Sequence, residues 1–276
     1  MCWLTDFFRE GSYMPRTDTR RYRLRLLIPG LCAILVLLCL GVVFFEMFYM
    51  PKPGTAEEKV WLYTKTHGYS LRDYPQSLIT LLEGNPETEK FVLEYPTAKD
   101  AAPVIDMTEY LHTDSVPLLM QWDQRWGYMK YGSDMAALTG CGPVCLSMAA
   151  LYVTDDPDMS PDQILRFALE NNYYVSGSGS SWTLISEGGV KLGLSVKELP
   201  LVKGLIDKSL EAGKPVICAM RAGDFTTSGH YIVLAGIEDG KYRVNDPNSY
   251  ANSEKLWSYE QIEGQIRNLW SIGAGE

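Results

Sequence analysis

Histidine is scarce in this chain, which has only three among 276 residues: His67, His112 and His230. Any chemistry that depends on an imidazole is therefore restricted to these positions. The sequence contains no G-x-x-x-x-G-K-[ST] phosphate-binding loop, and it shows no internal repeat and no low-complexity tract. The signatures of a P-loop nucleotidase and of a repeat protein are thus both missing.

Cysteine is also too sparse to build a disulfide framework. Of the six cysteines, Cys2 lies near the N-terminus, while Cys32 and Cys39 lie inside an apolar run. The remaining three are Cys141, Cys145 and Cys218. An odd number at irregular spacing in so long a chain argues against disulfide stapling, so one of these three could instead be a reactive thiol.

Excess positive charge is confined to the N-terminus. The formal net charge is -9, but residues 1–26 carry six arginines and three acids, a local charge of +3, so the rest of the chain carries -12. Phosphate backbones are bound through clustered lysines and arginines, which this acidic part lacks. We therefore expect no nucleic-acid partner.

One long apolar run is present near the N-terminus. Residues 26–45 contain no charged side chain, and twenty helical residues rise about 30 Å, the thickness of a bilayer core. Arginines crowd its N-terminal side, which the positive-inside rule keeps cytoplasmic. We predict a cytoplasmic basic tail (1–25), a single transmembrane anchor (26–48) and an extracytoplasmic remainder. A cleaved signal or a lipoprotein is the alternative, although a signal h-region is usually only about 7–15 residues long.

The predicted extracytoplasmic part begins with a helical stalk and connector over residues 49–115. Amphipathic helices are expected over 55–66 and 75–95, the second interrupted at Asn85-Pro86, and an extended connector over 96–117. From residue 116 onward, helical patterns come first and strand patterns follow, which is typical of an α+β domain. One helix is expected directly after Cys141. Four more are expected over 160–171 (with a capping box at Ser160), 182–192, 201–212 and 258–266. The expected strands span 215–221, 230–237, 241–246 and 268–272, with a hairpin turn at Asp239-Gly240.

Cys141 is the strongest candidate for a nucleophile. It stands between two glycines at a predicted helix start, where small residues let a substrate backbone approach. A free thiol titrates near 8.5, and a helix N-terminus contributes only roughly 0.3–1 kcal/mol toward the thiolate. A neighbouring imidazolium can supply the rest, and His230 is the suitable histidine. The alternative is a buried structural cysteine, which suits Cys145 and Cys218 better.

The partners of such a pair can also be sought in the sequence. Asp246 or Asn245 could orient His230, and strand alternation allows only one of them to face it. The Cys141 N–H could stabilise an oxyanion together with Gln121 or Gln124. A zinc site from Cys141, Cys145 and His230 has weak spacing, and Asn-Asp-Pro-Asn is also ordinary turn chemistry.

Four blocks of this sequence resemble papain-like double-glycine leader peptidases, and more closely the stand-alone relatives in cysteine peptidase family thirty-nine. The blocks are Gln121-Trp122-Asp123, residues 139–143, residues 228–234 and residues 244–247. The resemblance covers roughly 116–276 and implies a papain-like fold, with Cys141 as nucleophile, His230 as general base, Asp246 as its orienter and Gln121 as oxyanion donor. Leader peptidases proper are fused to an exporter ATPase, so processing of leaders in cis is not implied.

We therefore expect a membrane-anchored, extracytoplasmic cysteine peptidase that hydrolyses peptide or isopeptide bonds through a thioester. Its partners would be a peptide or protein substrate, or a cell-wall peptide, and the membrane. No cofactor is expected, because a thiolate–imidazolium pair needs none. The alternatives are a catalytically silent binding module and a cell-wall amidase or transpeptidase that uses the same thiol.

Overall fold

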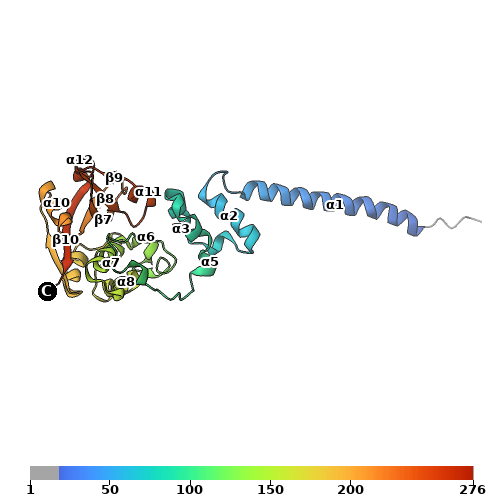
Figure 1. Cartoon of the computed structure of the whole chain (residues 1–276). Helices are drawn as coiled ribbons and strands as arrows, with labels where there is room; N and C mark the ends of the chain where they lie inside the picture. The colour runs from blue at the N-terminus through green and yellow to red at the C-terminus, as the bar shows by residue number, and fades with distance from the viewer. Residues whose placement is uncertain (1–18, 276) are drawn as a thin grey trace, which may run out of the picture. The chain divides into compact units, whose positions relative to one another are not determined.

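A computed structural model describes residues 19–275, without the side chains of residues 19–27, 43 and 45–49. The chain forms two compact units, Met1–Pro53 and Gly54–Glu276. The described part of the first unit is dominated by one long helix, α1 (Thr19–Tyr49), which contains Pro29 (Figure 1). The predicted basic tail (1–25) lies largely outside the described residues.

Helix α1 includes the charge-free run of residues 26–45. Its described large apolar side chains between Ile28 and Phe44 are all more than half exposed. Within the residues that the structure describes, no helix has the length and apolar character needed to cross a membrane. Side chains at both ends of the predicted anchor (26–48) lie outside those residues.

The second unit opens with a group of short helices, as predicted. Helix α2 (Ala56–His67) is capped by Thr55, whose hydroxyl accepts a hydrogen bond from Glu58 N, and it ends at Gly68 with φ of 75°. Helix α3 (Gln76–Gly84) stops before Asn85-Pro86, because proline cannot continue a helix and restricts the residue before it. A 3₁₀ turn (Pro86–Thr88), α4 (Glu89–Leu93) and α5 (Tyr95–Ala98) follow.

This helical segment packs against the rest of the second unit. Its apolar core includes Ala137, and Phe91 stacks on Tyr128 with ring centroids 4.2 Å apart. Tyr128 also donates a hydrogen bond to the Phe91 carbonyl at 2.6 Å. A side chain at Gly127 would meet the Phe91 ring at 2.7 Å, so this close approach requires glycine. The predicted division at residue 116 therefore falls inside one compact unit that begins at Gly54.

A six-stranded antiparallel sheet forms the centre of the unit, in the order β5-β10-β6-β7-β8-β9. Its strands are β5 (Leu194–Glu198), β6 (Val216–Arg221), β7 (Gly229–Glu238), β8 (Lys241–Asn245), β9 (Leu256–Trp257) and β10 (Ile266–Ala274). The predicted hairpin at Asp239-Gly240 is confirmed, and both residues have positive φ, as its tight turn requires. β5 and β9 were not predicted.

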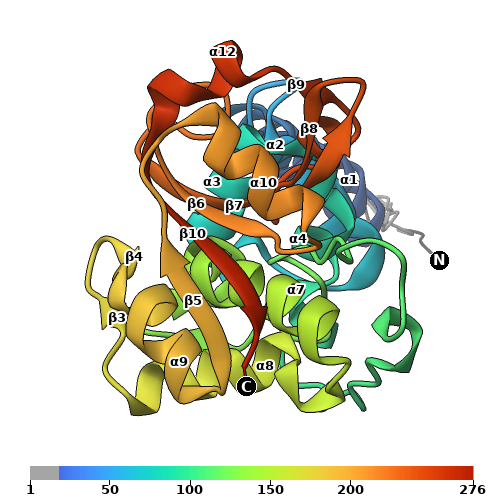
Figure 2. The ribbon, with the colours of Figure 1, turned by 60° about the vertical axis from the view of Figure 1, so that its left-hand side comes forward.

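Helices cover both faces of the sheet (Figure 2). On one face, α7 (Cys141–Thr154) packs on β6, β7 and β10, with α8 (Pro161–Glu170) beside it. On the other face, α10 (Lys203–Glu211) packs on β6 and β7. Successive residues of β6 alternate between the two hydrophobic cores, because side chains in a strand alternate between faces. An α+β fold with an antiparallel sheet is thus confirmed.

Smaller elements complete the fold, and some differ from the predictions. The predicted capping box at Ser160 is wrong: its hydroxyl bonds Asp162 rather than the helix backbone. Residues 182–192 form a π-helical turn (Leu184–Gly188) followed by α9 (Gly189–Lys191). The predicted helix over 258–266 is only α12 (Tyr259–Ile262) and a 3₁₀ turn. The others are β1 (Lys130–Tyr131), β2 (Asp134–Met135), α6 (Ala136–Thr139), β3 (Tyr174–Val175), β4 (Gly179–Ser180), α11 (Tyr250–Ser253) and the 3₁₀ turns at Leu71–Asp73, Thr108–Tyr110 and Pro157–Met159.

Candidate active site

Cys141 is the first residue of α7, as the sequence predicted, and its side chain is half-buried. The first N–H groups of a helix have no partner within the helix and carry the positive end of its dipole. α7 itself is held rigidly, because every residue from Gly142 to Leu151 is buried. The thiol is therefore presented at a fixed, electropositive position.

The two glycines that flank Cys141 have a structural role that differs from the predicted one. A Cβ at Gly142 would lie 2.8 Å from the Ser180 Cβ, and one at Gly140 would lie 2.6 Å from the Ala136 carbonyl oxygen. The space is therefore filled by the protein and is not left open for a substrate backbone. Ser180 is held by Tyr131, whose hydroxyl is 2.7 Å from its Oγ, and by Tyr231, which donates to its carbonyl at 3.1 Å.

His230 and Asp246 form a buried pair. His230 is the second residue of β7, and Asp246 directly follows β8. Because the two strands are antiparallel neighbours, the start of β7 lies beside the end of β8. His230 Nε2 and Asp246 Oδ1 are 2.7 Å apart, and their side chains are 7% and 1% exposed. Both side chains are almost completely removed from solvent, so the pair is well protected from screening.

Cys141 is the other side chain that acts on the His230 ring, where it raises the pKa of the imidazole together with Asp246. Since Asp246 uses Nε2, Nδ1 is the ring nitrogen that remains for the thiol. Burial lowers the pKa of His230, but the hydrogen bonds to Asp246 and Cys141 and the charges of both outweigh burial and raise the pKa to about 10. The site therefore favours an imidazolium between two potential anions.

Asp246 is fixed by groups that the sequence did not single out. Its Oδ1 also accepts from Asn248 N at 2.9 Å, and its Oδ2 accepts from Asn252 Nδ2 at 2.8 Å. Its own N–H donates to Ser253 Oγ at 3.0 Å. The Asn-Asp-Pro-Asn turn gives a signal for Asn248, whereas nothing in the sequence marks Asn252 or Ser253 in advance.

The structure distinguishes the paired alternatives that the sequence left open. Asn245 points away from His230 and donates to the carbonyls of Val116 and Pro117, both at 3.0 Å. Gln124 bonds Glu94 at 2.7 Å in the helical segment. Gln121 is buried and donates through Nε2 to the Ala137 carbonyl at 2.6 Å, in the short helix α6 that leads to Cys141.

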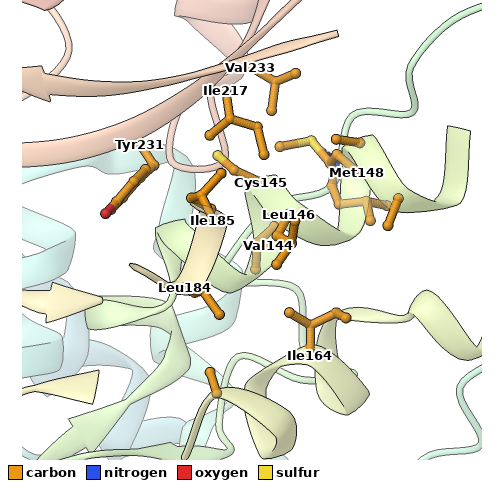
Figure 3. Close-up of a cluster of buried hydrophobic side chains, with 14 of the residues drawn as sticks. Val144, Cys145, Leu146, Met148, Ile164, Leu184, Ile185, Ile217, Tyr231 and Val233 are labelled. Carbon is orange, nitrogen blue, oxygen red and sulfur yellow. Dashed lines mark hydrogen bonds between the residues drawn. The ribbon is translucent and has the colours of Figure 1, made fainter. Parts of the chain in front are cut away.

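The two other thiols of the second unit lie in its hydrophobic cores. Cys145, one turn after Cys141, lies among Ile185, Ile217 and Val233 (Figure 3). Cys218 lies in the opposite core. Burial raises the pKa of both thiols. Both therefore stay neutral, as expected for structural cysteines. Among the described residues, no group of three histidine, cysteine or acidic side chains is arranged to hold a metal ion.

The two other histidines lie at the surface, away from these groups. His67 stacks on Tyr63 at 3.8 Å and hydrogen-bonds its carbonyl, and His112 pairs with Asp155 at 3.1 Å. The structure thus brings together Cys141, His230 and Asp246, with Gln121 bonded to the helix before Cys141. Their catalytic roles stay predictions.

Comparisons with known proteins find similar solved structures and a matching family. Two solved structures are similar over 58% of the chain. One is the peptidase domain of Streptococcus ComA, a bi-functional ABC transporter involved in a quorum sensing pathway, with 19% identity, 99% of its own chain covered and a TM-score of 0.41. The other, described as a C39-like peptidase from Bacillus anthracis, has 16% identity, 96% of its own chain covered and a TM-score of 0.35.

No curated protein matches the sequence. A family model, described as the Peptidase C39 like family, matches residues 113–273. The match contains all four residues of the candidate site and spans more than half of the chain. This chain therefore belongs to the Peptidase C39 like family.

Proposed function

We propose that this protein is a cysteine peptidase in which Cys141 is the nucleophile, His230 the general acid–base and Asp246 the residue that orients His230. The observation that carries the proposal is the buried His230–Asp246 pair whose second ring nitrogen is left for a helix-start cysteine. A nucleophile, a base and an orienting group in hydrogen-bond contact are the requirements of covalent acyl transfer. Membership of a peptidase family supports the same chemistry.

The first half of the reaction forms a thioester. The Cys141 thiolate attacks the carbonyl carbon of the scissile bond, and the carbonyl electron pair moves to oxygen. When the tetrahedral intermediate collapses, the C–N bond breaks and His230 Nδ1 gives its proton to the leaving amine. In the second half, His230 takes a proton from water, the resulting hydroxide attacks the thioester, and the C–S bond breaks. The products are a carboxylic acid and the regenerated pair of Cys141 thiolate and protonated His230.

The oxyanion formed in each half needs preorganised donors. The backbone N–H of Cys141, at the free start of α7, is one such donor. The Gln121 carboxamide can supply the second, because Nε2 has another hydrogen besides the one bonded to Ala137. Gln121 Oε1 is buried without a hydrogen-bond partner among the described residues, an arrangement that usually costs about 1–3 kcal/mol. Unpaired buried groups of this kind call for an explanation, and a catalytic role for Gln121 supplies one.

Replacing Gln121 with alanine is expected to reduce kcat by about 10²- to 10³-fold, with KM nearly unchanged, because the lost donor acts mainly on the transition state. Steady-state kinetics on a peptide substrate measures this. Gln124→Ala is the matched control, since its carboxamide bonds Glu94 in the helical segment. Equal losses in the two variants would show that Gln121 has no special role.

The substrate class is tested with the purified full-length chain. We expect hydrolysis of unstructured proteins or synthetic peptides, which is measured by the appearance of new amino groups. Iodoacetamide should inhibit this hydrolysis. Isolated peptidoglycan is the comparison substrate. Release of cell-wall peptides without any peptide cleavage would replace the peptidase proposal with a cell-wall amidase. Binding of peptides without turnover of either substrate would favour a silent binding module.

We also propose that α1 anchors the protein in the cell membrane, with the peptidase unit on the extracytoplasmic side. Support comes from the charge-free run of residues 26–45, the arginines that precede it, and the exposed apolar side chains of α1. The full chain is expected to remain in the carbonate-washed membrane fraction. A double change, Leu35→Arg with Leu38→Arg, should release it, since each charge at mid-membrane costs about 2.5–3.5 kcal/mol. Wild-type protein in the soluble fraction would contradict the anchor.

A further inference from the structure

The helical segment of residues 54–98 lies outside the part of the chain that the family model matches, residues 113–273. It nevertheless contacts the loop that carries the candidate orienting carboxylate. We call residues 246–253 the Asp246 loop; it ends in helix α11. The 3₁₀ turn that follows α3 is bonded to this loop, and α3 and α11 lie next to each other in Figure 1.

Glu87 holds the outer end of the Asp246 loop. Its Oε2 accepts from Tyr250 N at 2.7 Å, and its Oε1 accepts from Ala251 N at 2.9 Å. These N–H groups belong to the first turn of α11, where a helix has no internal acceptors and favours a negative charge. One carboxylate thus holds two adjacent backbone groups with charge-assisted hydrogen bonds. Glu87 is itself held, because its N–H donates to Asn85 Oδ1 at 3.1 Å.

Asn85 holds the middle of the same loop. Its Nδ2 donates to the Asn248 carbonyl oxygen at 2.6 Å, and Trp122 Nε1 donates to the same oxygen at 3.2 Å. Asn85 and Glu87 are two residues apart at the break between α3 and α4. The break caused by Asn85-Pro86 therefore places both side chains on the loop.

The inner side of the Asp246 loop holds the carboxylate. Asn248, whose carbonyl Asn85 binds, donates its N–H to Asp246 Oδ1 at 2.9 Å. Asn252 follows the two residues bound by Glu87, and its side-chain Nδ2 donates to Asp246 Oδ2 at 2.8 Å. One carboxylate oxygen is thus oriented by Asn248, which the helical segment binds directly, and the other by Asn252, which directly follows residues that the helical segment binds.

We propose that Asn85 and Glu87 are positioning residues that lock the Asp246 loop, so that Asp246 is aimed at His230 and His230 at Cys141. This inference rests on the proposed function above. Through these two residues, the helical segment outside the family-matched region positions the candidate site and is more than a passive spacer. It acts through Asn248 and Asn252 without touching the reacting atoms.

The test uses the full-length chain and two readouts, peptide hydrolysis and the rate of Cys141 alkylation by iodoacetamide at neutral pH. Glu87→Ala is expected to lower kcat and the alkylation rate by about 10- to 100-fold. This is the range found when a group that orients a metal-binding side chain is removed, and Glu87 would orient Asp246 in a comparable way. KM should change by less than about twofold, because the substrate contacts are untouched. Glu87→Gln keeps one of the two acceptor oxygens and should recover part of the loss.

Glu89→Ala is the matched control, because Glu89 lies only two residues further along the chain and pairs with Lys59 inside the helical segment. It should behave as wild type. A double-mutant cycle separates positioning from general destabilisation. The double variant Glu87→Ala with Asn252→Ala should lose no more activity than the worse single variant, since both residues act on Asp246. If the fold-losses of activity in the two single variants instead multiply in the double variant, the proposal is overturned.

Asn85→Ala provides a second route if Glu87→Ala does not fold. Trp122 still pairs the Asn248 carbonyl in that variant, so its fold should survive while the alkylation rate and kcat fall. Wild-type rates in a folded Asn85→Ala and in Glu87→Gln would contradict the positioning role. An ordinary, slow thiol in the wild-type protein would instead contradict the proposed function, so the two failures are distinguishable.

Discussion

Replacing Cys141 with alanine should abolish peptide hydrolysis, with a loss of roughly 10⁶-fold in kcat, the size seen when a catalytic triad loses its nucleophile. Such a factor corresponds to roughly 8 kcal/mol of transition-state stabilisation. The effect should be this large because no other thiol of the second unit can take over: Cys145 and Cys218 are fully buried, and burial raises the pKa of both. Kinetics on the purified variant, after its thermal unfolding has been compared with wild type, measures the loss.

Cys218→Ala is the matched control for this change. It removes a thiol from the core on the opposite side of the sheet, so it should lower stability modestly and leave kcat close to wild type. Wild-type hydrolysis by Cys141→Ala would show that the active nucleophile is another residue. The disappearance of iodoacetamide labelling from residues 54–276 in the same variant gives an independent check, because Cys141 is then absent and Cys145 and Cys218 are buried.

Replacing Asp246 with asparagine should lower kcat/KM at neutral pH by roughly 10²- to 10⁴-fold and should move the alkaline limit of activity. The active form needs a protonated His230, whose pKa is raised to about 10, so wild-type activity should fall as the pH rises through about 10. Burial lowers this pKa, and the bond to Asp246 is the largest influence that raises it. Without the carboxylate the pKa falls, so activity should be lost at a lower pH than in wild type.

The measurement is a pH profile of kcat/KM for both proteins between about pH 5 and 11. Asn245→Ala is the control at the neighbouring position. It leaves the carbonyls of Val116 and Pro117 without their donor, which should reduce the free energy of unfolding by about 1–3 kcal/mol. It should not move the alkaline limit, because Asn245 does not touch His230. An unchanged limit in Asp246→Asn would exclude Asp246 as the orienting group.

Much of the local structure could be predicted from the sequence because it depends on neighbouring residues. The short, mostly apolar runs over 215–221 and 230–237 gave β6 and β7, and Asp239-Gly240 gave the turn that joins β7 to β8. The helix start at Cys141 followed from Gly140 and Pro143, and the break between α3 and α4 from Asn85-Pro86. Glycine and proline constrain the backbone wherever they occur, so these features need no tertiary context.

Other local predictions failed where tertiary contacts decided the outcome. Ser160 has the sequence of a capping box, yet its hydroxyl bonds Asp162, which in turn pairs with Arg166. Gly142 suggested access for a substrate, yet the space beside it is filled by Ser180, which follows it by 38 positions in the chain. β5 was missed because its pattern is short, and it is a strand only through its pairing with β10.

The sequence by itself determined which residue types could perform the chemistry: one helix-start cysteine, one histidine at a strand start and one carboxylate after the next strand. It could not choose between Asp246 and Asn245, or between Gln121 and Gln124, because that choice depends on which way each side chain points. Only the tertiary structure placed Asp246 against His230, and only it brought Asn85 and Glu87 onto the Asp246 loop, more than 160 residues away along the chain. Hydrogen bonds between such distant residues leave no periodic pattern in the sequence, since they form only after the helical segment and the sheet have packed together.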